Sequence, residues 1–478
     1  MSAEQTAIAW HRFGLGARPG DLKDAASQPI TALLDDVARA LAPPELSRLP
    51  DAPGLFAQFQ RQQAERKMAK ASATDAKSVT QDASTVTSMR LMGAAPPAPN
   101  LGTSGQAGKP GGVIRDAVLD EIDARLKLAR NAPLGFGERL AQFWANHFTV
   151  SGTSQPVHIL CGAFEREAIR PHLTGSFRDM LQAAESHPAM LLYLNNERSM
   201  GPNSPAGQKQ EKGLNENLAR EILELHTLGV DGGYAQADVT SFANAITGWS
   251  MVGGKSIEGT PGAFIFRPRT HEPGAKRVLG RGYAQEGRAQ GQAVLADLAA
   301  HPATTKHIAT KLVRHFIADD PPPAAVSAVA AAFQKSSGEL MPVYEALLCA
   351  PAAFAKPMTK LRPPRDYAIA AMRALDVDLD AKRYFRVMSL LGQTPFKPPS
   401  PQGWSDDSKA WLAPDAIAKR LELASLLAQA ARTEKPLERA KAVLGPLLSE
   451  ETSSTIEHAE SGGQALALLL MSPEFQRR

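Results

Sequence analysis

Apolar residues recur at intervals of three and four along most of the chain, which is the spacing of one face of an α-helix. Pro and Gly interrupt this pattern at the points where helices end. The two signals together predict helices at about 29–41, 114–130, 133–146, 159–169, 177–185, 189–195 and 236–247, with further helical patterning over 286–335 and 415–478. The chain is therefore predicted to be mainly α-helical.

Two segments depart from the helical pattern. Residues 262–283 combine aromatic and apolar residues with Pro and Gly, which predicts a small extended hairpin or an irregular loop. Residues 394–412 contain four prolines and Gly403, which exclude a helix over the first half of the segment. This loop carries Trp404 and Trp411 beside two aspartates. It is either a component of a functional site or a loop held in place by buried tryptophans.

The densest polar cluster falls on a predicted helix over residues 214–228. On a helical wheel this segment has an apolar stripe, and four polar residues lie together on the flank of the stripe. The four residues are Asn217, Arg220, Glu221 and Glu224. His226 lies about 160° from Glu224 on the wheel. It therefore joins the cluster only if the helix bends.

The polar cluster has two interpretations. Two carboxylates three residues apart, beside a guanidinium and an amide, can bind a cation, or can hold one carboxylate protonated because like charges disfavour joint ionisation. Alternatively, the cluster ties the helix to its neighbours through charge-assisted hydrogen bonds. Glu216 and Arg220 stand in the favourable acid-first order, four residues apart.

Further candidates for chemistry are polar residues set among apolar ones in other segments. For each histidine among them, the alternative is a helix-end residue that donates to a carbonyl oxygen. A site assembled from distant segments would use a carboxylate as general base or metal ligand. Its candidate residues are Asn146, His147, His187, Arg220, Glu221, Glu224, His226, His271 and Trp404.

The string HPATTKHIATKLVRHF carries two further signals. It places His307, Lys311, Arg314 and His315 on one helical face, which can receive an anion or can simply be solvated. Its first residues, His301-Pro302, repeat His187-Pro188. Because proline fits the first turn of a helix, both pairs are predicted to be helix starts.

Between about 62 and 112 the composition shifts to Ala, Ser, Thr, Gln, Lys and Gly. Such a segment buries too little apolar surface to order itself, which predicts a low-complexity, disordered insertion whose early part can still be helical. The expected organisation is an N-terminal helical part of the core at 1–61, the insertion at 62–112 and the main helical domain at 113–478. Outside the insertion we expect a single large multi-helix domain.

Composition limits the class of protein. The 478 residues are 43% hydrophobic, which is enough for a sizeable core. The net charge of +4, without a concentrated basic run, argues against a nucleic-acid binder. The two cysteines lie far apart and give no thiol zinc site. Neither a secretory signal peptide nor a run of about 18 apolar residues is found. We therefore expect a soluble, cytoplasmic protein without a membrane span.

Several common catalytic motifs are missing from the sequence. It contains no HExxH, GxSxG or GxxxxGK[ST] motif and no Glu-x-x-His pair of the di-iron type. A standard zinc protease, serine hydrolase or P-loop enzyme is therefore disfavoured. The residues identify no cofactor and no metal.

A family resemblance is carried by FWANHFTVS, IRPHLTGSFRDML, HPAMLLYLNN, GLNENLAREILELHTLGVDGGYAQADV and the PSPQGW loop. These strings resemble the bacterial family catalogued as domain of unknown function 1800, over nearly the whole chain outside the insertion. One departure is Ala235, where the family more usually has Thr as a helix N-cap. The resemblance implies no activity, cofactor or catalytic residue, because the family has none established.

The resemblance also implies a possible partner. Members of the family are often encoded beside a second family, domain of unknown function 1501, which resembles the alkaline phosphatase and sulfatase group and is often exported. Two functional hypotheses follow: an enzyme with the assembled His/Glu site, or a non-catalytic helical partner of such a neighbour-encoded protein. In the second case the polar cluster is internal scaffolding, and export with the partner to the periplasm is the alternative location.

Overall fold

The computed structural model describes residues 2–23, 28–83, 112–209, 213–253, 259–431 and 435–478, with side chains in the helix that ends at Ala83 described as far as residue 71. The described residues are mainly helical, with two short pairs of antiparallel strands. The predicted fold class is therefore confirmed. Most of the predicted insertion, residues 84–111, lies outside the described residues.

The helices of the first half follow the predicted positions closely. They are α1 (Ala3–Ile8), α2 (Pro29–Arg39), α3 (Ala52–Ala83), α4 (Gly112–Asn131), α5 (Phe136–His147), α6 (Gln155–Phe164), α7 (Phe177–Ser186), α8 (Pro188–Tyr193), α9 (Asn217–Glu221) and α10 (Gln236–Ala245). Helix α3 passes through position 62 without a break, so the early part of the expected insertion is helical. This part is rich in Ala, Gln, Lys, Arg and Glu, which are strong helix formers.

The second half is helical where the pattern predicts it, and it has two further helices between residues 364 and 390, a range for which none was predicted. Its helices are α11 (Arg288–Ala299), α12 (Pro302–Phe316), α13 (Pro323–Lys335), α14 (Leu340–Cys349), α15 (Pro364–Leu375), α16 (Ala381–Leu390), α17 (Pro414–Ala430), α18 (Pro436–Leu444), α19 (Glu450–Glu457), α20 (Gly462–Met471) and α21 (Pro473–Gln476). The loop between α16 and α17 keeps the irregular course that its prolines predict, with one short 3-10 turn near its end.

The starts of α8 and α12 confirm the reading of the two His-Pro pairs. The ring Nδ1 of His187 accepts a hydrogen bond from the backbone amide of Ala189 at 3.1 Å. His301 does the same for Ala303 at 3.2 Å. In both helices proline occupies the first turn. Backbone N–H groups there have no acceptor within the helix, so proline, which lacks an N–H, loses no helical hydrogen bond. These two histidines are therefore N-caps.

Short turns of other helix types connect the α-helices. The 3-10 turns are η2 (Pro44–Leu46), η4 (Arg170–His172), η5 (Asn196–Arg198), η6 (Gly207–Lys209), η8 (Pro268–Thr270), η9 (Pro351–Phe354), η10 (Ser408–Trp411) and η11 (Gly445–Leu447). The π-helical turns are η1 (Ala9–Phe13), η3 (Glu165–Ile169) and η7 (Ile222–His226). A π turn bonds five residues apart, so it rotates the side chains that follow relative to a regular α-helix.

The predicted helix over 214–228 is corrected in two ways. It begins at Asn217, three residues later than expected, and from Ile222 to His226 it is the π turn η7. A regular wheel is therefore wrong for its second half. The wider π turn adds a residue to the turn, which changes the direction of His226 relative to the residues before it.

The extended region is also larger than predicted. Strand β1 (Trp249–Met251) pairs antiparallel with β2 (Phe264–Phe266), and β3 (Lys276–Val278) pairs antiparallel with β4 (Arg281–Tyr283). The single hairpin expected within 262–283 is thus one of two pairs, and β1 lies outside the predicted range. The pattern misses β1 because three residues are too few to show strand alternation.

Helix α5 lies at the centre of one hydrophobic core, whose buried members range from Ala7 to Phe475. Aromatic side chains surround the helix. The ring of Trp144 packs on Phe148 and Phe177, and its Nε1–H donates to the hydroxyl of Tyr344 at 2.8 Å. A tryptophan ring that is 0% exposed needs such a partner for its single polar atom. This rigid setting positions the polar residues of α5.

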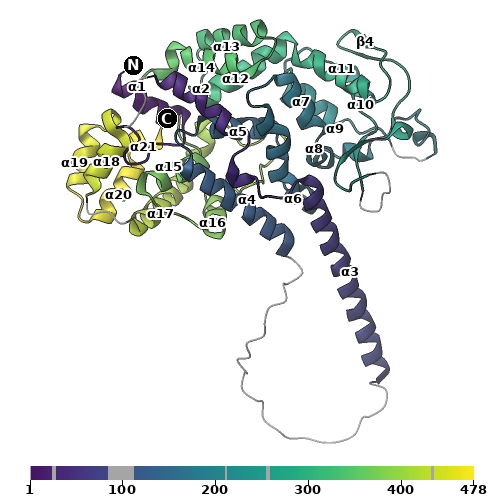
Figure 1. Ribbon diagram of the computed structural model, residues 1–478, viewed down its shortest axis with the longest axis horizontal. Helices are drawn as coiled ribbons and strands as arrows, with labels where there is room; N and C mark the ends of the chain where they lie inside the picture. The colour runs from purple at the N-terminus through teal and green to yellow at the C-terminus, as the bar shows by residue number, and fades with distance from the viewer. Residues whose placement is uncertain (1, 24–27, 84–111, 210–212, 254–258, 432–434) are drawn as a thin grey trace, which may run out of the picture.

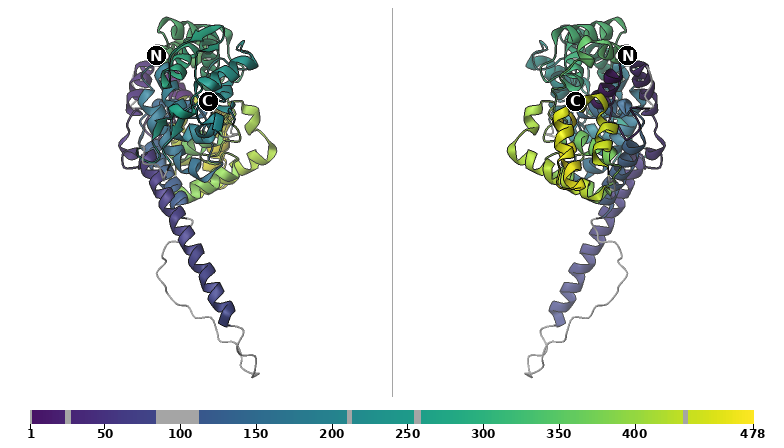
Figure 2. Two further views of the ribbon diagram at one scale, coloured as in Figure 1. Left: turned by 90° about the vertical axis from the view of Figure 1, so that its right-hand side faces the viewer. Right: turned by 90° about the vertical axis from the view of Figure 1, so that its left-hand side faces the viewer.

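Figure 1 shows a broad helical body from which α3 projects as a long arm, with the start of α4 returning beside it. Both views in Figure 2 show the same arm leading away from the body. The C-terminal helices α17–α21 form one end of the body, α7–α11 lie toward the opposite end, and α12–α14 run along the edge drawn at the top. Within the described residues, no helix is both long enough and apolar enough to cross a membrane.

Candidate functional site

A cavity of about 170 Å³ lies between helices α4, α5, α6, α15 and α16 and the loop 393–406. Much of its wall is apolar, with Ile122 and Leu126 from α4, Ile369 from α15, Met388 from α16 and Phe396 from the loop. The polar part of the wall consists of Arg125, Glu138, Gln142, Asn146, Thr149, Glu165, Arg170, His315, Arg365, Asp366, Tyr384, Gln393, Trp404, Ser405 and Asp406.

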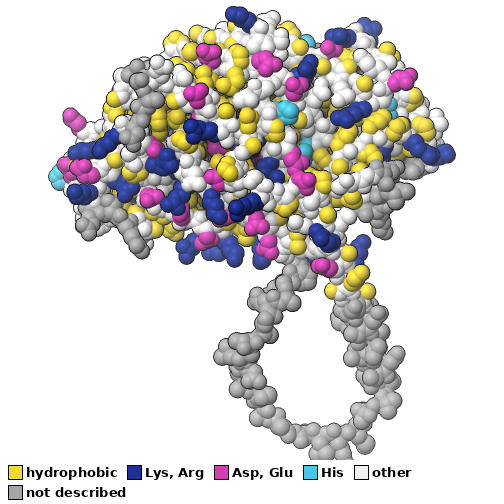
Figure 3. All heavy atoms as spheres, in the orientation of Figure 1, with side chains coloured by type: hydrophobic (Ala, Val, Ile, Leu, Met, Phe, Trp, Pro, Cys, Tyr) yellow, Lys and Arg dark blue, Asp and Glu magenta, His cyan; other side chains and the backbone are white. Residues whose placement is uncertain are grey.

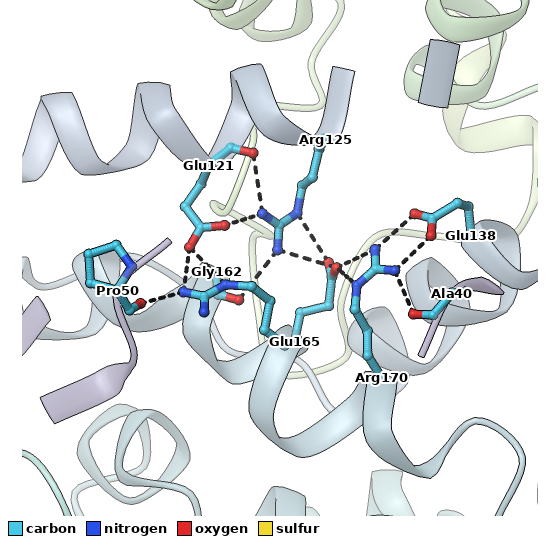
Figure 4. A network of polar contacts seen from close by, with 9 residues as sticks. Ala40, Pro50, Glu121, Arg125, Glu138, Gly162, Glu165 and Arg170 are labelled. Carbon is cyan, nitrogen blue, oxygen red and sulfur yellow. Dashed lines mark hydrogen bonds and ion pairs between the residues drawn. The ribbon is translucent and has the colours of Figure 1, made fainter. Parts of the chain in front are cut away.

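A network of paired charges forms one side of the cavity (Figure 4). Arg170 donates to both oxygens of Glu138 at 2.7 and 2.8 Å, and to Glu165 Oε1 at 2.8 Å. Arg125 bridges Glu165 and Glu121. Arg166 Nη2 donates to Glu121 Oε1 at 2.9 Å. In this network three guanidiniums meet three carboxylates, so the charges of this wall compensate one another.

The network fixes the charge of Glu165. Burial alone would raise the pKa of this carboxyl, but the charges of Arg125 and Arg170 outweigh burial and lower the pKa to about 2. Glu165 opens the π turn η3, and Arg170 follows it by five residues, which is the spacing that a π turn brings together. A regular helical wheel separates the two residues, so the pairing leaves no simple signal in the sequence.

Arg365 is the cation of the wall that the network does not compensate. It stands in the first turn of α15, and its backbone amide donates to Gln393 Oε1 at 2.8 Å. Among the residues that the structure describes, none makes a hydrogen bond or ion pair with its guanidinium, whose Nε is buried. The charge of Arg365 also contributes to the lowered pKa of Glu165, which places it near the network.

Two neutral polar groups share this situation. Gln142 of α5 has its Oε1 buried without a hydrogen-bond partner in the described part of the chain. The hydroxyl of Tyr384, on α16, forms no hydrogen bond with a described residue, but unlike Gln142 Oε1 it is not fully buried; burial of the side chain raises the pKa of this phenol. Gln142 and Tyr384 line the same cavity as Arg365. The cavity therefore presents one unpaired cation and two unpaired neutral groups.

His315 and Asp406 lie on another part of the wall. His315 Nδ1 donates to Asp406 Oδ1 at 2.6 Å, since a carboxylate can only accept. The Nε2 of the same ring then accepts from Arg139 Nη2, 3.2 Å away. Burial lowers the pKa of His315 although Asp406 opposes the shift. Both ring nitrogens are occupied, so this histidine is held neutral and in one orientation.

The loop 393–406 closes the cavity through contacts with α5. Asn146 and Trp404 exchange two hydrogen bonds: Asn146 Nδ2 donates to the Trp404 carbonyl at 2.9 Å, and the Trp404 amide donates to Asn146 Oδ1 at 2.7 Å. Phe396 has a φ of 60°, in the left-handed region that non-glycine residues rarely occupy. Residues with such unfavourable backbone conformations occur most often at binding and active sites, where the surrounding structure holds them in place.

Replacing Gly403 with alanine is expected to destabilise this closure. Gly403 has a φ of 84°, and a Cβ atom there would lie 2.6 Å from the Asn146 carbonyl oxygen. The backbone conformation alone costs a non-glycine residue about 1–3 kcal/mol, and the clash adds to this. The free energy of unfolding measured in urea should fall. Gly463→Ala is the matched control, since a Cβ at Gly463 would meet nothing within 4 Å. Equal stability of the two variants contradicts the prediction.

Residues 8–477 match the model of a family described as Protein of unknown function (DUF1800). The chain belongs to this family. This confirms the resemblance carried by the motifs. No curated protein and no solved structure matches the chain. Every residue that lines the cavity falls within the matched range, so the cavity lies in the DUF1800 part of the chain.

Among the residues predicted to form a site, the DUF1800 chain brings Asn146 and Trp404 together at the cavity. His147 follows Asn146 but faces into the core, where its Nε2 donates to the carbonyl of His226 at 3.1 Å. His226 Nδ1 lies 2.8 Å from Glu185 Oε1, and both side chains are buried. His147 and His226 thus belong to an interior polar group separate from the cavity.

The remaining predicted residues have partners of their own. His187 Nε2 contacts Glu167 Oε2 at 3.2 Å, in addition to capping α8. The ring of His271 lies 2.9 Å from the carbonyl oxygen of Thr247. Neither histidine lines the cavity. Their catalytic roles stay predictions, and the contacts of these two histidines add no support for them.

The polar cluster of α9 and η7 keeps part of its predicted form. Arg220 donates to Glu216 Oε2 at 3.2 Å, in the acid-first order expected, and to Gln236 Oε1 at 2.9 Å. Glu224 accepts from the hydroxyl of Tyr234 at 3.4 Å. Burial raises the pKa of Glu221, and the charge of Glu224 adds to the shift. The joint ionisation of the two carboxylates stays a prediction, and Asn217 is exposed.

The histidine-rich face of α12 turns inward. His315 lines the cavity, and His307 Nε2 donates to the Leu225 carbonyl at 3.1 Å. Burial lowers the pKa of Lys311, while the charge of Asp406 raises it. Of the four residues predicted on this face, only Arg314 is exposed. In the described part of the chain, no three His, Cys, Asp or Glu side chains are placed to hold a metal ion.

Proposed function

We propose that this DUF1800 chain binds a small organic molecule in the cavity between α4, α5, α6, α15 and α16. The observation that carries the proposal is a pair of buried polar atoms without a partner among the described residues, Arg365 Nε and Gln142 Oε1, which line a cavity together with apolar side chains and the hydroxyl-bearing Tyr384. A ligand site has this composition, with mostly apolar lining and a few polar groups that orient the ligand. A buried donor or acceptor without a partner lowers the stability of the folded state by about 1–3 kcal/mol. A bound molecule that forms the missing hydrogen bond offsets this loss.

The chemistry of the wall favours binding over general base catalysis. Glu138 and Glu165 already accept hydrogen bonds from Arg170, and both nitrogens of His315 are occupied. An efficient general base must instead be free to reach the proton that it removes. The enzyme hypothesis therefore gains support only from Asn146 and Trp404, which stand on the wall.

A variant that fills the cavity tests the proposal. Ala145 lines the cavity from α5, and Ala145→Leu introduces three carbons into the space. Ligand-observed NMR of a fragment library should find compounds that bind the parent protein with a Kd between about 10 µM and a few mM, as expected for ten or so non-hydrogen atoms. Their affinity should fall at least about tenfold in Ala145→Leu, because the added side chain overlaps the ligand.

Ala145→Ser is the control, because it keeps the side chain small and should retain the compounds. Compounds that bind parent and Ala145→Leu equally would place the site elsewhere. A library that yields no binder in the millimolar range contradicts the proposal as a whole.

A partner role is the second proposal, in which the chain binds a neighbour-encoded protein of the domain of unknown function 1501 family. Two observations favour it. Most of the predicted His and Glu residues are bonded inside the fold, as scaffolding would be. Large apolar side chains are also exposed just before α17, at Leu412 (49%), and on its first turns, at Ile417 (37%) and Leu421 (51%), and exposed apolar clusters often mark protein interfaces. Co-expression of the two proteins should give a complex that Leu421→Asp dissociates.

The predictions on nucleic acid and location remain part of this proposal. Acidic and basic side chains intermix over the face drawn in Figure 3, which agrees with the small net charge and with our expectation that the chain binds no nucleic acid. A mobility-shift titration at low salt tests this. A cytoplasmic location, or a periplasmic one by export with the partner, is tested by fractionation of the native host.

A further inference from the structure

We propose that the ligand of the cavity is a small monocarboxylate whose apolar body is about the size of a benzene ring. The inference rests on the proposed function and names its ligand class. The geometry that points to it is the unpaired guanidinium of Arg365, which lines the cavity together with members of the compensated charge network and apolar side chains.

The charge of the ligand follows from the groups that surround the cavity. In the network, the cations Arg125, Arg166 and Arg170 match the carboxylates Glu121, Glu138 and Glu165 in number. Arg365 adds one positive charge beside them. A single negative charge compensates it, whereas a doubly charged ligand would bring an excess negative charge next to three carboxylates, which is unfavourable at low dielectric.

The other acids of the wall do not compensate Arg365. Asp366 lies 3.4 Å from Arg139 and 3.1 Å from Arg478, so two guanidiniums already flank it. Asp406 accepts the hydrogen bond of His315. Both acids are thus engaged on their own side of the cavity, and an anion beside Arg365 meets no unpaired carboxylate among the described residues.

The shape of the anion follows from the donors. A guanidinium is a planar fork that binds carboxylate with two parallel hydrogen bonds. The Nε of Arg365 is buried and has no partner. Its N–H, with that of the neighbouring Nη, can therefore donate to the two oxygens of a carboxylate. The hydroxyl of Tyr384 supplies a third donor on the same cavity. The unpartnered Oε1 of Gln142 remains to accept a hydrogen bond from a donor on the body of the ligand.

The body of the ligand follows from the volume and the apolar wall. The cavity measures about 170 Å³, and an apolar cavity of about 150 Å³ is known to hold benzene. Ile122, Leu126, Ile369 and Met388 provide the apolar surface. A ring or branched chain of about six carbons beside the carboxylate matches this space, while a long fatty chain exceeds it.

Benzoate and its neutral analogue benzamide are the probes for the test, with phenyl phosphate as the dianionic alternative. Isothermal titration of the parent should show benzoate binding at least about tenfold more tightly than benzamide, because hydrogen bonds between a guanidinium and a carboxylate are stronger than those to a neutral amide. In Arg365→Met the affinity for benzoate should fall about 30-fold, and that for benzamide less than about threefold. Arg365→Lys should fall between, since lysine keeps the charge without the fork.

The outcomes separate this inference from the proposed function. Benzamide that binds as tightly as benzoate, or phenyl phosphate that binds more tightly, overturns the monocarboxylate and leaves the small-molecule site standing, provided that Ala145→Leu abolishes the binding. Benzoate affinity that Arg365→Met does not change overturns the role of Arg365. No binding of any probe or library compound overturns both proposals. Circular dichroism shows whether each variant is folded. If Arg365→Met is not folded, the affinity of Arg365→Lys for benzoate is used instead.

Discussion

Replacing Arg170 with methionine lowers the free energy of unfolding by about 3–5 kcal/mol, because the change leaves two buried carboxylates without their shared cation. Arg170 is 2% exposed and donates to both oxygens of Glu138 as well as to Glu165. Methionine keeps an apolar side chain in the core, so the loss measures the broken ion pairs rather than a cavity. Urea unfolding at neutral pH, followed by circular dichroism, gives the difference.

The control for this prediction is an ion pair outside the core. Arg178 lies 3.4 Å from Asp179, and both side chains are more than half exposed. Arg178→Met should change the free energy of unfolding by less than about 0.5 kcal/mol, since solvent screens the pair. If the two methionine variants unfold within about 1 kcal/mol of each other, the network of Figure 4 does not stabilise the wall of the cavity.

The helical architecture could be predicted because its signals are local. Proline in the first turn and a capping side chain mark the starts of α8, α12 and α21 directly in the sequence. The periodic apolar residues between such marks predict helices within a few residues of their observed bounds. Strand β1 could not be predicted, because its three residues extend only by pairing with β2.

The π turns could not be predicted, and they decide where several polar residues point. In η7 the π turn places His226 Nδ1 2.8 Å from Glu185 Oε1, a partner on α7 that a helical wheel of this segment alone does not indicate. In η3 the same geometry joins Glu165 to Arg170. A five-residue turn changes the register of one short segment and leaves the average period of the sequence almost unchanged.

The candidate site was predictable only at its edges. Asn146 and Trp404 stand out as polar or aromatic residues in apolar or proline-rich strings, and both line the cavity. Arg365 follows two prolines at the start of a helix, where an arginine is usually solvated. Its place in the candidate site arises from helices α4, α5 and α16, which are distant in sequence and line the same cavity. Only the assembled fold makes its guanidinium an unpaired group.

Acidification from about pH 6.5 to pH 4 is expected to destabilise the protein by several kcal/mol, because buried histidines are kept neutral in the folded state. Burial lowers the pKa of His11 to about 3. Burial, and next the charge of Lys311, lower the pKa of His307 to about 4. In the unfolded chain these rings titrate near 6.5. The folded state therefore binds fewer protons, so the stabilisation is complete above about pH 6.5 and is lost as the pH falls toward the folded pKa.

His307→Gln isolates one of these groups. The glutamine amide can still donate to the Leu225 carbonyl that His307 Nε2 contacts at 3.1 Å, but it does not titrate. The fall in the free energy of unfolding between pH 7 and 4, measured in urea, should be smaller by about 3 kcal/mol in the variant, at about 1.4 kcal/mol for each pKa unit. His458→Gln, at the exposed residue that follows α19, should keep the parental slope. Glu165, whose pKa is lowered to about 2, loses its stabilisation only from about pH 4.5 downward, so it contributes little to this window. Parallel slopes for parent and His307→Gln would mean that His307 does not become charged on unfolding in this range, and the buried neutral ring would then be ruled out as the origin of the acid sensitivity.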